Sequence, residues 1–136
     1  MSIVTSEAAS RELSVVGEVA VVEGHEHSAG RPSPRHLPRR SVRTLTAAGD
    51  LLRALAAPVR IAIVLELREA DRCVHELVEA LGVAQPLISQ HLRVLKAAGV
   101  VHGERHGREV VYRLVDEHLS HIVVDAVEHS EEDRAR

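Results

Sequence analysis

The feature that most limits the fold is a pair of short amphipathic segments with only a brief interruption between them. The first, "CVHELVEALG", carries four apolar residues at helical spacing, and the second, "AQPLISQHLRVLKAAG", carries three: Val74, Leu77, Val78 and Leu81, then Ile88, Leu92 and Leu95. The sequence therefore predicts two short helices separated by "GVAQ". Gly82 and Gly99 follow these helices where a left-handed residue commonly ends a helix.

The segments on either side predict further elements of two kinds. Helical spacing of Leu45, Ala48, Leu52 and Leu55 precedes Pro58, which suits the first turn of another helix, "PVRIAIVLELREA". After Gly99 the apolar residues alternate, which predicts strands over 100–105 and 109–114 and a turn around Gly107. A last amphipathic helix over 116–132 is expected to bury four positions, namely Leu119, Ile122, Val123 and Ala126 or Val127.

Composition favours a mainly α fold with a small β-hairpin. A single Tyr and no Trp or Phe leave Leu, Val, Ile and Ala to form the core, within a length that suits one domain. Residues 1–40 lack sustained periodicity and end in a stretch rich in Pro, Gly, Ser and Arg, so we expect a flexible tail before a domain over 41–133. One Cys and no apolar run of signal-peptide or membrane-spanning length favour a cytoplasmic protein with no membrane partner.

Charge is divided between two parts of the chain. Residues 31–113 hold 14 Arg or Lys against 8 Asp or Glu, whereas residues 114–136 hold 2 against 7. The basic part favours a polyanionic partner, and the acidic end favours either a solvated surface or a cation site.

Two short helices followed by a hairpin form the pattern of a winged helix-turn-helix, whose second helix enters the major groove of double-stranded DNA. The outer side of that helix carries amide, hydroxyl, imidazole and guanidinium groups that can bond base edges or phosphates: Gln85, Ser89, Gln90, His91 and Arg93. The hairpin tip adds three groups that can reach the flanking DNA backbone or the minor groove: Arg105, His106 and Arg108. One such module binds weakly, so we expect a dimer that reads two half-sites.

The last predicted helix carries metal-type ligands at both ends. Asp116 and His118 lie at its start, while His129 and Glu132 lie near its end and share one face. His118 and His129 are about 16 Å apart along a helix axis, so one ion cannot contact both in one chain. Two antiparallel copies of the helix remove this obstacle. The pattern predicts a homodimer with two symmetric Zn²⁺ sites, each with ligands from both chains.

These segments together resemble the ArsR/SmtB family of repressors. "APVRIAIVLEL", "CVHEL" and "QPLISQHLRVLKAAGVV" are similar to three successive helices of that family, and the D-x-H and H-x-x-E pair resembles the interhelical zinc site of its SmtB-type zinc sensors. The resemblance implies a homodimeric repressor that binds operator DNA without metal and releases it on binding zinc, which derepresses zinc efflux or homeostasis genes. Ala84 departs from the Ser that often caps the family's reading helix.

The resemblance also implies a possible accessory metal site. Cys73 and Glu76 match half of a second family site, and His25, His27 and His36 of the tail can supply further ligands. Alternative hypotheses are a winged-helix repressor that senses cobalt, nickel or, through Cys73, redox state, and a DNA-binding module without any ligand. A hydrolytic metalloenzyme needs an open coordination position and a substrate pocket. Since all four ligands are used on a dimer seam, we expect neither an enzyme nor a small organic substrate.

Overall fold

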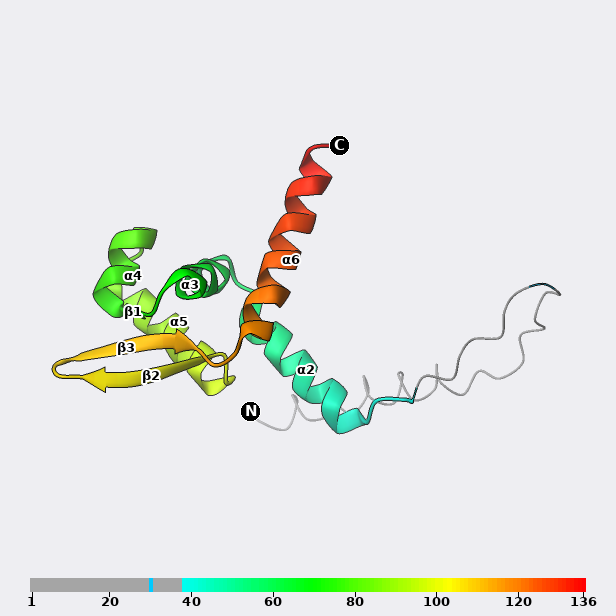
Figure 1. The fold of residues 1–136 in the computed structure, drawn as a ribbon, viewed down its shortest axis with the longest axis horizontal. Helices are drawn as coiled ribbons and strands as arrows, with labels where there is room; N and C mark the ends of the chain where they lie inside the picture. Colours follow the sequence, from blue (N-terminus) through cyan, green and yellow to red (C-terminus); the bar gives the residue numbers. More distant parts are fainter. Residues whose placement is uncertain (1–29, 31–37) are drawn as a thin grey trace, which may run out of the picture. The chain divides into compact units, whose positions relative to one another are not determined.

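The computed structural model describes residue 30 and residues 38–136. The described helices and strands belong to the compact unit Arg39–Arg136 (Figure 1). The tail predicted over residues 1–40, with its three histidines, lies almost entirely outside the described residues. The elements in chain order are α2 (Val42–Leu55), α3 (Pro58–Glu69), β1 (Arg72–Cys73), α4 (Val74–Leu81), α5 (Gln85–Ala97), β2 (Val101–His106), β3 (Glu109–Leu114) and α6 (Glu117–Arg134).

Local sequence signals begin and end the helices as expected. The Ser41 hydroxyl caps α2 by accepting the Thr44 backbone N–H at 3.2 Å, and Pro58 occupies the first turn of α3. Gly82 and Gly99 both have left-handed backbone angles, with φ of +64° and +74°. These angles strain residues that carry a side chain, so the two predicted helix stops are confirmed.

The wing is a three-stranded antiparallel sheet in the order β1, β3, β2, rather than a hairpin alone. Strand β2 runs one residue later than predicted, and the two-residue strand β1 was not predicted; it pairs Arg72 with Tyr112. Gly103 of β2 lies opposite Tyr112 of β3. A Cβ atom added to Gly103 would be 3.1 Å from the Tyr112 ring. The only aromatic side chain therefore packs across a glycine within the wing.

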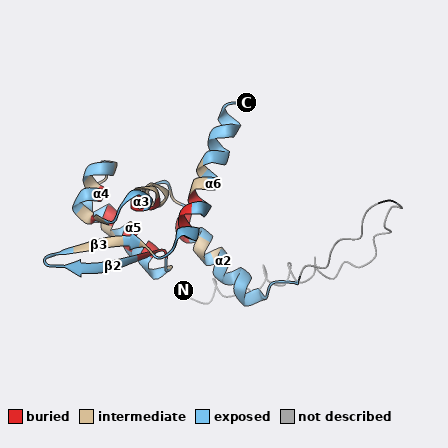
Figure 2. Cartoon of the chain, viewed as in Figure 1, coloured by how far each residue is buried: buried red, intermediate tan, exposed pale blue. Residues whose placement is uncertain are grey.

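The core is aliphatic, as the composition predicts. Figure 2 shows the buried residues concentrated where the helices meet near the base of the sheet. The cluster consists of Leu55, Ile63, Val64, Leu67, Leu77, Ile88, Leu92, Leu95, Val100, Val101, Leu119 and Val123. This arrangement confirms the mainly α winged helix-turn-helix.

The last helix buries fewer residues than its sequence pattern predicts. Leu119 and Val123 enter the core, and Val127 packs against it. Ile122 is exposed, so the prediction that it is buried is wrong for the single protomer, and of the alternatives Ala126 and Val127 it is Val127 that packs on the core. Helix α6 packs on α3 and β3, and Ile122 lies outside these contacts.

Leu77→Ala tests the core. Leu77 is fully buried, so removing its side chain leaves a cavity and should lower the free energy of unfolding by about 2–5 kcal/mol. Leu87→Ala is the matched control, because Leu87 is 50% exposed and its truncation should change stability by about 0.5 kcal/mol or less. Urea titration followed by circular dichroism measures both variants. Equal losses in the two variants would contradict this description of the core.

Candidate DNA interface and metal site

Helix α5 has a buried side and an outer side that carries polar groups. Ile88, Leu92 and Leu95 face the core, while Gln85, Gln90 and Arg93 are exposed and Ser89 is half-buried. The first turn of α5 contains no acidic residue, and Ala84 provides no side-chain cap. The amino end of the helix therefore presents its positive dipole end without a competing carboxylate, which suits a phosphate group.

His91 faces α3 rather than lying wholly on the outer side of α5. Its Nδ1 is 3.3 Å from Nη1 of Arg60, and Nε of Arg60 donates to the carbonyl oxygen of Ala54 at the end of α2. A guanidinium can only donate, so Nδ1 of His91 is the acceptor in this pair. Arg60 thus connects α2 and α3 to α5, the predicted DNA-reading helix. Sequence periodicity gave no signal for this contact between residues 31 positions apart.

The wing tip combines basic side chains with nearby carboxylates. Arg105, His106 and Arg108 are all exposed, and His106 Nε2 lies 3.8 Å from the Glu104 carboxylate. Within the described part of the chain, Arg105 and Arg108 form no ion pair. Their charges are therefore available to a polyanion.

The predicted ligands at the start of α6 converge. Asp116 precedes the helix in an extended conformation and caps it, its Oδ1 accepting the Leu119 backbone N–H at 3.4 Å. The same oxygen lies 3.5 Å from Nδ1 of His118, whose side chain is 93% exposed. Capping thus holds the Asp116 carboxylate beside the imidazole, although the two residues are only two positions apart.

The other two predicted ligands lie far along the same helix. His129 and Glu132 are both exposed on α6, which is continuous from Glu117 to Arg134. Among residues 38–136 of one protomer, no three His, Cys, Asp or Glu side chains are close enough to hold a metal ion together. A four-ligand site built from these residues therefore requires a second chain.

Two helices present apolar side chains that no other part of the described chain, residues 38–136, fully covers. The exposed fractions are 60% for Val42, 51% for Leu45 and 55% for Leu52 on α2, and 36% for Ile122 on α6. Side chains of this size are usually buried in a core or an interface. Across the described helices, none is both long and apolar enough to span a bilayer.

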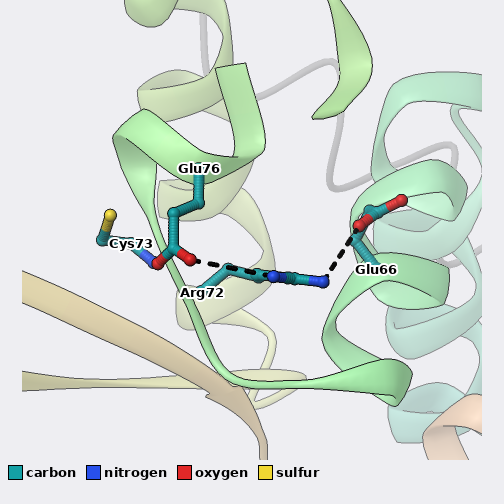
Figure 3. Close-up of polar contacts among 4 residues, drawn as sticks. All are labelled: Glu66, Arg72, Cys73 and Glu76. Carbon is teal, nitrogen blue, oxygen red and sulfur yellow. Dashed lines mark hydrogen bonds and ion pairs between the residues drawn. The ribbon is translucent and has the colours of Figure 1, made fainter. Parts of the chain in front are cut away.

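Cys73 and Glu76 form a helix cap, and Figure 3 shows their contacts. A carboxylate oxygen of Glu76 accepts the Cys73 backbone N–H at 3.0 Å, and Arg72 lies between Glu76, at 3.7 Å, and Glu66, at 3.8 Å. Hydrogen bonds from Cys73, its backbone N–H foremost, and then the charge of Arg72 lower the pKa of Glu76 below its ordinary value of 4.5. The pair predicted as an accessory metal site is thus already used in starting α4, and its thiol is buried.

Glu76→Gln tests this cap. Because the folded-state pKa of Glu76 is lowered, its ionisation stabilises the fold above about pH 4.5, and this contribution is lost as pH falls through the folded-state pKa. The variant should therefore melt below the wild type at pH 7, and the gap should narrow as the pH falls below about 4.5. Differential scanning calorimetry across pH measures the gap, with the exposed Glu79→Gln as control. A gap independent of pH would contradict the charged cap.

Two substitutions at His91 separate its two ring nitrogens. His91→Asn keeps an acceptor near the position of Nδ1, so it should retain the Arg60 contact and near-wild-type DNA affinity. His91→Gln keeps a polar group near Nε2 but loses that acceptor, and should weaken DNA binding by roughly fivefold, the equivalent of about 1 kcal/mol. Fluorescence anisotropy with a labelled duplex measures both. The reverse order would show that His91 acts through a direct DNA contact instead.

Comparison with known proteins gives a consistent family assignment. The sequence profile of the family described as "Bacterial regulatory protein, arsR family" matches residues 57–102, which span α3 to the start of β2. The chain is 66% identical over 121 residues to the HTH-type transcriptional repressor SmtB of Mycobacterium tuberculosis, covering 82% of this chain and 84% of that protein.

Two solved structures share the fold. The solution structure of apo-NmtR is 37% identical, with a TM-score of 0.57 over 80% of this chain and 89% of that one. The homodimeric winged helix-turn-helix DNA-binding domain Mb0332 of Mycobacterium bovis is 25% identical, with a TM-score of 0.60 over 71% of this chain and 92% of that one. The predicted class of protein, a transcriptional regulator, is confirmed by this similarity. With two thirds of the aligned residues identical to a repressor along most of both chains, this protein belongs to the ArsR family of bacterial regulatory proteins.

Proposed function

We propose that this protein is a zinc-responsive transcriptional repressor. A homodimer without metal binds operator DNA in the cytoplasm, and zinc binding between the two α6 helices releases it, so that zinc efflux or homeostasis genes are expressed. The observation that carries the proposal is the pair Asp116 and His118, brought within 3.5 Å of each other at one end of a continuous helix whose other end bears His129 and Glu132.

The distance between Asp116 and His118 fits a shared ion. Zinc bonds of about 2 Å at a tetrahedral angle place two donor atoms roughly 3.3 Å apart. Oδ1 of Asp116 is the oxygen that lies 3.5 Å from Nδ1 of His118 and also caps α6. A carboxylate oxygen has two lone pairs, so Oδ1 can accept the capping hydrogen bond and still bind the ion. Two imidazoles and two carboxylates make a closed four-coordinate set that suits a structural or regulatory zinc rather than a catalytic one.

Exposed apolar side chains support the second chain that this set requires. Val42, Leu45 and Leu52 of α2 and Ile122 of α6 are exposed within the described part of one protomer. In an antiparallel pairing of two α6 helices, the start of each helix meets the end of the other. A two-fold axis then produces two identical sites, and each site has two ligands from one chain and two from the other.

The proposed switch requires two arrangements of the dimer, one that binds DNA well and one that binds it poorly. Zinc changes DNA affinity only if it binds more tightly to one of these arrangements than to the other. Zinc that bridges the α6 helices favours one angle between the protomers, and this angle sets the spacing of the two α5 helices. The described contacts link α6 to α5 through α3, because α6 packs on α3 and Arg60 of α3 contacts His91 of α5. An unsuitable spacing weakens both half-sites at once.

The competing sensor hypotheses receive different support. A redox sensor acting through Cys73 requires an accessible thiolate, whereas this thiol is buried. A cobalt or nickel sensor uses the same types of ligand as a zinc sensor, so titrating each metal against DNA affinity is needed to separate them.

Zinc-dependent DNA release is measured with a labelled duplex from the region upstream of this gene, at fixed salt. Zinc should weaken the wild-type complex at least tenfold and have little effect on His118→Ala. His121→Ala is the matched control, since His121 lies one turn further along α6 and should respond like the wild type. If His118→Ala responds fully to zinc, the interhelical site is not the switch.

Mixed dimers of His118→Ala and His129→Ala test whether ligands come from both chains. Each homodimer lacks one ligand in both sites, whereas antiparallel pairing gives the mixed dimer one intact site. The mixed dimer, isolated with two different affinity tags, should bind one zinc with wild-type affinity. If its zinc affinity is no better than that of either homodimer, the antiparallel arrangement is wrong.

A further inference from the structure

Helix α5 exposes two apolar side chains whose position the core does not explain. Leu87 is 50% exposed and Val94 is 37% exposed, although Ile88, Leu92 and Leu95 of the same helix are at most 1% exposed. Neither Leu87 nor Val94 belongs to the core cluster or to the partly buried residues that pack against it. Exposing a Leu forfeits most of the stabilisation that its burial would provide.

These two side chains share a strip of the helix with a polar group. Positions 87, 90 and 94 are spaced by three and four residues, so Leu87, Gln90 and Val94 follow one another along one side of α5. Leu87 is the third residue of the helix and stands nearest its amino end. In winged and other helix-turn-helix proteins, residues at this end of the second helix contact base edges in the major groove.

Among the base-edge groups exposed in the major groove, the C5-methyl group of thymine is the apolar one. Adenine, its partner, presents N6 and N7, a donor and an acceptor that the side-chain amide of Gln bonds as a pair. An apolar side chain one turn before a Gln therefore matches an A·T pair or two adjacent A·T pairs. A solvated surface or a phosphate contact would not favour Leu at this position, because Leu cannot form hydrogen bonds.

We propose that Leu87 determines operator specificity by packing on a thymine methyl group, beside an adenine bonded by Gln90, with Val94 extending the apolar contact along the groove. This inference rests on DNA binding through α5. It assigns sequence reading to a residue that donor and acceptor chemistry alone overlooks.

The test replaces thymines of the upstream duplex by deoxyuridine, one position at a time and symmetrically in both half-sites. Deoxyuridine keeps base pairing and removes only the methyl group. At one thymine per half-site, the wild type should bind the substituted duplex about fourfold more weakly for each methyl group lost, or roughly 15-fold in total, as expected for one buried methyl group in each half-site. Leu87→Ala should bind the two duplexes equally. Anisotropy titrations at one salt concentration measure all four affinities.

Val115→Ala is the control variant. Val115 is 49% exposed, lies outside α5 between β3 and α6, and its loss should leave the thymine preference intact. A wild type that binds the upstream duplex no better than an unrelated one would overturn the proposed repressor function itself. A wild type that binds specifically but shows no deoxyuridine effect, or a Leu87→Ala variant that retains the full effect, would overturn only the role of Leu87.

Discussion

The packing of α3 is the interaction on which the remaining structure depends. This helix contacts α2, α4, α5, α6 and β3, and its buried residues Ile63, Val64 and Leu67 occupy the centre of the aliphatic core. A core without large aromatic rings gains its stability from many small contacts, so the elements around α3 cannot shift independently without opening cavities. The helix that bears the metal-type ligands and the helix that reads DNA are therefore held by the same neighbour.

Helix α5 shows how one short element carries both stability and recognition. Its core side is among the most buried surfaces of the domain, and this burial fixes the orientation of its outer side chains. Recognition requires such fixed side chains, because hydrogen bonds and methyl contacts to base edges tolerate little misplacement. The uncapped amino end and the lack of acidic residues in the first turn weaken the helix slightly in isolation. Both features suit an approach to phosphate groups.

Most of the fold could be predicted because its signals are local. Helical spacing, Pro58 and two glycines located α3, α4 and α5 to within a residue or two. The contacts that were missed join distant parts of the chain. The two-residue strand β1 forms only because Arg72 meets Tyr112, and Arg60 meets His91 only after α3 and α5 have packed. Ile122 is a different kind of miss. The helical spacing of apolar residues predicts that it is buried, but in one protomer it is exposed.

The charge of α6 determines what kind of coupling the proposed switch can use. The last 23 residues carry an excess of five negative charges, which opposes the approach of DNA. A bound zinc ion reduces that excess, so its electrostatic effect alone would strengthen DNA binding, although screening over about 8 Å at physiological salt keeps this effect small. Release by zinc therefore needs a geometric effect of opposite sign and larger size. A two-fold dimer provides such a geometric effect, because a change in the angle between the protomers displaces both α5 helices. One change at the dimer interface therefore makes the free energy of DNA binding less favourable at both half-sites.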